Sequence, residues 1–113
     1  VSLHVNYHAD THGMIGPEEL AACKPGAVLV NTSRGGLIDE QALLAALQNG
    51  QLSAAALDVL ADERNVQEDH PLIAYARTHD NLLIVPHIGG NTYESFTRTE
   101  GFIADKVIEW LRE

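Results

Sequence analysis

The sequence predicts an α/β fold built on a parallel sheet. Strand-like apolar segments lie at residues 1–6, 27–31, 52–60 and 82–88. Helical patterns separate the first three segments, and a polar loop with one helical turn precedes the fourth. Parallel strands need crossover connections of this kind, whereas antiparallel strands are joined by short hairpins. The chain therefore favours a parallel sheet with helical crossovers.

The two helices between these strands carry start and stop signals. Pro17 stands at a first helical position, and Gly26 follows the end of that helix. Asp39 can cap the start of the second helix with its side chain, and Gly50 marks the end of that helix,. Leucines at 43, 44 and 47 give this second helix one apolar face,.

The rest of the chain is predicted from weaker patterns. Residues 61–81 are polar and irregular, with a helical turn expected at 71–76, and Pro86 stops the last strand,. A long helix is expected from Thr92 almost to the end. Its apolar face consists of Phe96, Ile103, Val107, Trp110 and Leu111.

Composition limits the classes of function. The 113 residues, 45% of them hydrophobic, suit one compact domain or part of one,. A net charge of −9 disfavours nucleic acid and anionic membrane surfaces, and no apolar run reaches the roughly 20 residues of a membrane helix,. The single cysteine, Cys23, excludes an intrachain disulfide and suits a reducing cytoplasm,.

Polar residues gather directly after the predicted strands. In open parallel sheets, ligands bind outside the carboxyl ends of the strands, so chemistry is expected at these positions. They are His4 and Asn6, residues 32–36, residues 58–63, and residues 87–91.

Arg34 is the residue in this group that a turn does not explain. Gly35 and Gly36 are adequate for a turn, and their spacing matches neither common phosphate-binding loop,. An arginine that directly follows an apolar strand needs an anion. Glu63 and His87 are its natural companions, because a carboxylate orients an imidazole for acid–base chemistry. Spacing alone leaves this trio and a set of ordinary surface charges as equal alternatives.

Two further patterns have simple structural explanations. His4, His8 and His12 would align for zinc on a helix, but they fall on a strand and a loop, so no metal site is expected,. Asp58 ends an apolar strand, where its carboxylate either caps a loop or accepts hydrogen bonds from a ligand amide.

Taken in order, the strand ends resemble those of the D-isomer-specific 2-hydroxyacid dehydrogenases, the family that contains D-3-phosphoglycerate dehydrogenase. The resemblance rests on "LVNTSRGGLIDE", "ALDV", "HPL" and "PHIGG" at family-like separations, and it covers nearly the whole chain. It implies a Rossmann-like, doubly wound parallel sheet and an oxidoreductase.

The resemblance also implies roles for individual residues. Arg34 would bind the carboxylate of a 2-hydroxy or 2-keto acid, His87 would transfer the proton, and Glu63 would pair with His87. The cofactor would be NAD, with NADP as the alternative, and Asp58 would bind its nicotinamide carboxamide. The cofactor-lining residues would be His4, Val5, Thr32, Ser33, Arg34, Asp58, His87, Gly89 and Gly90. The general pattern favours a phosphoglycerate-type member.

Several family features are missing. Asn6 and Arg64 stand where the family usually has proline, and no G-x-G-x-x-G turn for the cofactor pyrophosphate occurs,. Residues 1–113 are therefore expected to be the C-terminal half of a dinucleotide-binding domain, without a substrate domain and inactive alone. We expect a cytoplasmic homo-oligomer that self-associates through the strand edge at residues 1–6. The alternative is a non-catalytic, corepressor-like binding module that retains the dinucleotide fold.

Overall fold

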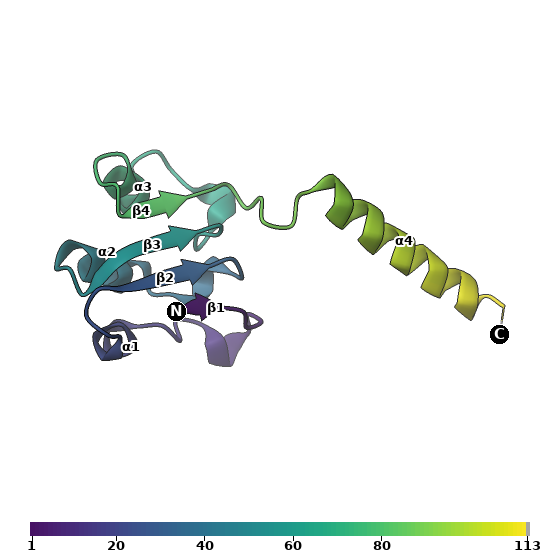
Figure 1. Ribbon diagram of the computed structural model, residues 1–113, viewed down its shortest axis with the longest axis horizontal. Helices are drawn as coiled ribbons and strands as arrows, with labels where there is room; N and C mark the ends of the chain where they lie inside the picture. The colour runs from purple at the N-terminus through teal and green to yellow at the C-terminus, as the bar shows by residue number, and fades with distance from the viewer. Residues whose placement is uncertain (113) are drawn as a thin grey trace.

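A computed structural model describes residues 1–112. Four strands form one sheet in the order β1-β2-β3-β4, and every pairing is parallel. Figure 1 shows the sheet with its strands pointing the same way. The parallel sheet predicted from the sequence is confirmed. The strands are β1 (Ser2–Leu3), β2 (Ala27–Asn31), β3 (Leu52–Leu57) and β4 (Leu82–Ile84).

Three helices connect the strands and form one layer. Helix α1 (Pro17–Ala22) contacts α2 (Glu40–Gln48), which in turn contacts α3 (Pro71–Ala76). Leucines from the strands and helices fill the space between this layer and the sheet, among them Leu29, Leu43, Leu52, Leu57 and Leu72. Short 3₁₀ turns cover Ala9–Thr11, Gly35–Leu37 and Glu63–Asn65.

The predicted signals account for helix α2. The Asp39 carboxylate accepts the N–H groups of Gln41 and Ala42, each at 3.0 Å, which satisfies two donors that have no partner within the helix,. Gly50 has a φ of +78°, a conformation that glycine adopts without steric cost, and the helix has ended by this point,. Leu43 and Leu47 are buried as predicted, whereas Leu44 is half-buried.

Three of the strands are shorter than the sequence predicts. The first is expected over residues 1–6, but β1 comprises Ser2–Leu3, and Val5 is exposed. Strand β1 pairs on one side with β2 and has no second neighbour in the described part of the chain, so little holds its far end. Strands β3 and β4 also end early, because Asp58 and Val85, the first residues after them, already belong to the loops beyond the sheet.

Helix α4 (Tyr93–Trp110) projects away from the rest of the molecule (Figure 1). Thr92 caps it by accepting the N–H of Ser95 at 3.1 Å, as the predicted start requires. Its apolar residues are exposed: 52% for Phe96, 55% for Ile103 and 71% for Trp110. The apolar face that the sequence predicts is therefore present, but nothing within residues 1–112 packs on it.

The sheet also has one apolar face without a helix layer. Val28 is 46% exposed and Leu83 is 61% exposed, on the side of the sheet opposite the buried leucines of the same strands. Parallel sheets usually have both faces covered, so this face is unusual for the fold. No helix among residues 1–112 has the length and apolar character needed to cross a membrane.

Candidate active site

The register of the sheet brings the ends of its strands together. Leu3 pairs with Asn31, Asn31 with Leu57, and Leu57 with Ile84. The residues that follow these four positions therefore leave the sheet at the same edge. They are the residues expected at the site: His4 and Val5, Thr32 to Arg34, Asp58, and the segment that leads to His87.

Asp58 holds the turn that follows His87. Its Oδ1 accepts the N–H of Ile88 at 2.7 Å, and its Oδ2 accepts the N–H of Gly89 at 2.8 Å. The residue is 5% exposed, and two charge-assisted hydrogen bonds compensate for the burial of its carboxylate,. Of the two alternatives left open for Asp58, the loop-capping role is present in the structure.

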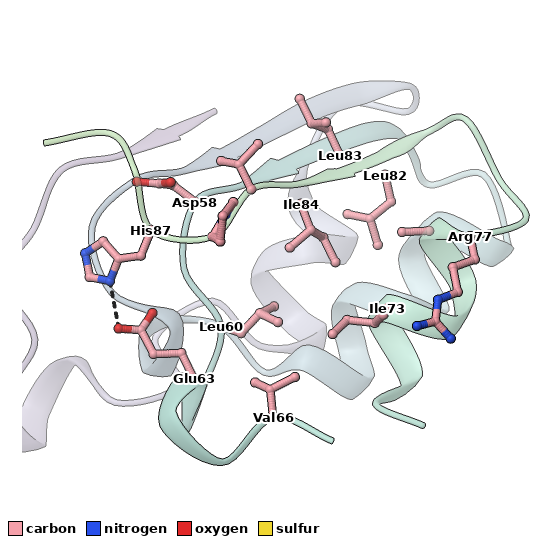
Figure 2. Close-up of a pocket in the computed structure, with 13 residues that line it drawn as sticks. Asp58, Leu60, Glu63, Val66, Ile73, Arg77, Leu82, Leu83, Ile84 and His87 are labelled. Carbon is pink, nitrogen blue, oxygen red and sulfur yellow. Dashed lines mark hydrogen bonds and ion pairs between the residues drawn. The ribbon is translucent and has the colours of Figure 1, made fainter. Parts of the chain in front are cut away.

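His87 and Glu63 form a pair (Figure 2). The imidazole Nδ1 lies 2.7 Å from Glu63 Oε1, and the two side chains are 44% and 40% exposed. An ionised carboxylate only accepts hydrogen bonds, so Nδ1 carries the proton of this pair. In the neutral imidazole, Nε2 is then the atom that can take a proton from another group. The contact between Glu63 and His87 that the sequence predicts is present in the fold.

A left-handed backbone conformation occurs at His87 itself and at the residue before Glu63. His87 has a φ of 53°, and Asp62, which directly precedes Glu63, has a φ of 50°. Left-handed conformations cost non-glycine residues on the order of 1 kcal/mol and persist when surrounding contacts impose them. Directly after His87, the N–H groups of Ile88 and Gly89 donate to Asp58, which holds the chain on this path.

The turn that carries Arg34 is built on Asn31. Asn31 is fully buried, its Nδ2 donates to the Arg34 carbonyl at 3.0 Å, and its Oδ1 accepts the Ser33 N–H at 3.0 Å. The Arg34 guanidinium is exposed and donates to the Ser33 carbonyl at 2.7 Å. No carboxylate pairs with it in the described chain. Arg34 thus lies in a turn held by two hydrogen bonds of Asn31, with most of its own donors exposed to solvent.

Gly35 brings this turn against the loop that carries Glu63. A Cβ placed on Gly35 would lie 1.9 Å from the Leu60 carbonyl carbon and 2.2 Å from the Ala61 nitrogen. No side chain fits there, so the glycine is required for backbone packing rather than for its φ. The Arg34 turn and the Glu63 loop are therefore in direct contact.

The remaining predicted cofactor residues lie at the exposed edge of the sheet. His4 accepts or donates a hydrogen bond with Ser2 Oγ at 2.8 Å, and Ser33 Oγ donates to the Leu3 carbonyl at 2.8 Å. Val5, Thr32, Gly89 and Gly90 are exposed. Within residues 1–112, no hydrogen bond joins any of these residues to the Glu63–His87 pair.

The three N-terminal histidines do not converge. His4 contacts Ser2, His8 lies 3.7 Å from Asp10, and His12 bonds the Tyr7 hydroxyl at 2.9 Å. Within residues 1–112, no three His, Cys, Asp or Glu side chains gather closely enough to hold a metal ion.

An open groove of about 600 Å³ runs from the His87–Glu63 pair along β4 (Figure 2). Beyond the pair, its walls are mostly apolar, with Asp58 and Arg77 as the charged exceptions, and most of them come from α3, β4 and the loop before α3. The lining includes Leu60, Val66, Ile73, Leu82 and Ile84. The pair therefore lies where a polar strand-end site meets an apolar surface, an arrangement typical of small-molecule sites.

The edge of the sheet at which the strands end has room for one half of a dinucleotide. Apart from its two chain neighbours, no residue among 1–112 has an atom within 4 Å of a Cβ placed on Gly90, and Gly89 presents backbone alone, so a flat ring can approach the turn closely. The phosphates are a different case, because the glycine-rich turn that usually binds a pyrophosphate is not among these residues,. The residues present suit the nicotinamide half of the cofactor.

Sequence reasoning did not single out three residues whose polar contacts lie in the loops next to the site: Asn31, Glu40 and His70. Asn31 offered a signal, since it is a polar residue at the end of a strand that is otherwise apolar. Glu40 and His70 lie 3.2 Å apart across two connections of the fold, and no local pattern links them.

The fold and its strand-end site define a Rossmann-like domain of the dinucleotide-binding class. The family model "D-isomer specific 2-hydroxyacid dehydrogenase, NAD binding domain" matches residues 1–89. This chain belongs to the D-isomer specific 2-hydroxyacid dehydrogenase family, and residues 1–89 match its NAD-binding domain.

Individual relatives agree with this assignment. The chain is 41% identical to a putative 2-hydroxyacid dehydrogenase of Haemophilus influenzae over 100% of this chain and 36% of the relative. It is 40% identical to a D-3-phosphoglycerate dehydrogenase of Methanocaldococcus jannaschii over 99% of this chain and 20% of the relative. A D-lactate dehydrogenase of Aquifex aeolicus, solved with NAD and lactic acid, matches with a TM-score of 0.80 and 34% identity over 98% of this chain and 36% of that one. The chain thus spans between a fifth and just over a third of these relatives.

Proposed function

We propose that this chain supplies the catalytic residues and the nicotinamide side of the cofactor site to an NAD-dependent oxidation of a D-2-hydroxy acid. The observation that carries the proposal is the 2.7 Å contact between His87 Nδ1 and Glu63 Oε1 at the strand-end edge. A surface charge pair alone would not require the left-handed backbone at His87 or the two bonds from Asp58 that maintain it. The family assignment is consistent with this role.

His87 is the proposed acid–base residue. With its Nδ1 proton directed to Glu63, the neutral imidazole accepts the hydroxyl proton of the substrate at Nε2, and Glu63 stabilises the imidazolium that results. NAD, when bound, supplies the hydride acceptor for the hydrogen on substrate C2. Loss of that proton and that hydride converts the 2-hydroxy acid to a 2-oxo acid.

Arg34 is the proposed substrate anchor. A guanidinium binds a planar carboxylate through two parallel hydrogen bonds, and the Asn31 bonds fix the turn from which Arg34 extends,. The absence of a carboxylate partner within residues 1–112 is consistent with an external anion. Contact between Gly35 and the Glu63 loop links the anchor to the acid–base pair.

Asp58 and the cofactor-lining residues complete the proposed site. A carboxylate has about four acceptor positions, and the bonds to Ile88 and Gly89 use two of them,. The others are proposed to accept the nicotinamide carboxamide. His4, Val5, Thr32, Ser33 and the turn at Gly89 and Gly90 form the proposed cofactor surface around it.

A chimera tests the function directly. The matching third of the Haemophilus relative, which aligns with this chain over its full length, is replaced by residues 1–113. We expect NADH to form with D-2-hydroxy acids and not with their L-isomers. Substituting His87 by Asn should lower kcat by about 10²–10⁴-fold, the usual contribution of a general acid–base residue. A chimera that binds NAD but turns over no D-2-hydroxy acid would favour the non-catalytic binding module instead.

Residues 1–113 assayed by themselves should show no turnover, because they contain no G-x-G-x-x-G turn to hold the pyrophosphate of the cofactor,. A rate of roughly 1 per second or more from this chain alone would contradict the expectation.

The proposed substrate class is a 2-hydroxy acid, and 3-phosphoglycerate is the candidate to assay first. The proposed location is the cytoplasm.

A further inference from the structure

We propose that Glu40 is a positioning residue for the Glu63–His87 pair, a role that rests on the function proposed above. Its carboxylate fastens both ends of residues 61–70, the loop that carries Glu63. Glu40 is the first residue of α2, and it reaches this loop from a different connection of the fold.

The two carboxylate oxygens of Glu40 have separate partners. Oε1 accepts the N–H of Ala61 at 2.7 Å, and Oε2 lies 3.2 Å from His70 Nε2. Ala61 opens the loop, and His70 closes it as the residue before α3. One side chain therefore joins the beginning of the loop to its end.

This contact is better shielded from solvent than the pair that it supports. The side chains of Glu40 and His70 are 19% and 16% exposed, against 40% and 44% for Glu63 and His87. His70 Nδ1 is buried and has no hydrogen-bond partner within residues 1–112, so the contact at Nε2 is the polar interaction that this part of the chain offers the ring. Burial of a carboxylate or an imidazole costs free energy because the group loses water. The contact between Glu40 and His70 offsets part of this cost for both side chains.

Few other contacts determine the path of the loop. Asn65 bonds Asp62 through its backbone N–H at 2.8 Å and its side chain at 2.9 Å, and both bonds lie within the loop. Val66 is the loop residue that packs on the core. The close approach of Gly35 fixes the backbone near Ala61 but not the end at His70. Without the Glu40 contacts, the loop would lose its tie at His70 and one of its two constraints at Ala61, and Glu63 would be held less firmly against His87.

A glutamate in the first turn of a helix also has a simpler explanation, since acidic side chains there interact favourably with the helix dipole. Glu18 provides the matched comparison, because it is an exposed glutamate in the first turn of α1. A dipole effect predicts similar results for Glu40→Ala and Glu18→Ala. The positioning role predicts that Glu40→Ala alone disturbs residues 61–70 and His87.

Nuclear magnetic resonance on the ¹⁵N-labelled full chain tests the proposal without any requirement for turnover. Two signals are followed: the exchange rate of the Ala61 amide and the imidazole nitrogen shifts of His87. Glu63→Ala gives the reference shifts for an unpaired His87. We expect Glu40→Ala to accelerate Ala61 exchange at least about tenfold and to move the His87 shifts most of the way to that reference. Glu18→Ala should change neither signal.

Conservative variants keep the test informative if Glu40→Ala folds poorly. Glu40→Gln retains an oxygen for Ala61 and should keep its exchange rate within about threefold of the parent, as a rescue. His70→Ala releases the far end of the loop and should shift the His87 signals toward those of Glu63→Ala. Parent-like Ala61 exchange and His87 shifts in both Glu40→Ala and His70→Ala would overturn the positioning role. Turnover of the chimera tests the proposed function separately, so failure of one does not imply failure of the other.

Discussion

The Asp58 carboxylate and the backbone of Gly89 fit each other so closely that a side chain at residue 89 has no space. Oδ2 of Asp58 accepts the Gly89 N–H at 2.8 Å, and a Cβ on Gly89 would lie 2.7 Å from the same oxygen. This contact sets the path of the chain directly after His87. Gly89, the first glycine of "HIGG", is therefore required because the Asp58 carboxylate lies against it, and not because of its own backbone dihedral.

Gly89→Ala should consequently destabilise the chain. The methyl group must displace a buried carboxylate, and we expect a loss of about 1–3 kcal/mol in the free energy of unfolding by urea titration. Gly90→Ala is the control, because nothing lies within 4 Å of a Cβ at that position, and its effect should stay within about 0.5 kcal/mol,. Equal effects of the two substitutions would contradict the role assigned to Asp58.

Asp58→Asn tests the same contact from the other side. The amide keeps the size of the carboxylate but places an NH₂ group against one of two backbone N–H donors. We expect a cost of about 1–3 kcal/mol, since a buried donor loses its acceptor. Asp39→Asn is the matched control, because asparagine caps helices as well as aspartate does,. Thermal or urea unfolding of both variants provides the comparison.

Gly35→Ala is expected to be more damaging than Gly89→Ala. Its Cβ would meet the backbone of Leu60 and Ala61, which cannot rotate away as a side chain can. We expect a loss of more than about 3 kcal/mol or failure to fold, measured as loss of the cooperative unfolding transition. Gly101→Ala in α4 has open space around it and should leave that transition in place. A well-folded Gly35→Ala variant would show that the two loops are not in the contact described.

Self-association is predicted through the open edge of β1. Val1 is 60% exposed and Val5 is 41% exposed, and β1 has an unpaired side among the described strands,. Light scattering at high concentration should detect dimers or larger species, and Val1→Lys and Val5→Lys should reduce them. Val107→Lys on α4 serves as the comparison. If that variant alone abolishes association, the exposed face of α4 is responsible and the edge prediction is wrong.

Much of the secondary structure could be predicted because its signals are local. Asp39 caps α2 as expected, and the helical turn predicted at residues 71–76 matches α3. The strand ends could also be located well enough to identify the edge at which polar residues gather. Strand lengths were less predictable, since pairing with a neighbour decides where a strand stops, as the short β1 illustrates.

The sequence by itself determined the order of strands and helices, the polar strand ends and the family motifs, because caps, turns and apolar periodicity act over a few residues. Only the tertiary structure decided which side chains meet. Glu63 pairs with His87, which lies 24 residues further along the chain. Asp58 accepts the N–H of Gly89, 31 residues away, and Glu40 at the start of α2 accepts the N–H of Ala61 in the loop before α3. It also left the apolar face of α4 exposed, although the same pattern in the sequence predicts a packing face. Such contacts depend on sheet register and on the path of each connection, and these are fixed only when the whole core packs.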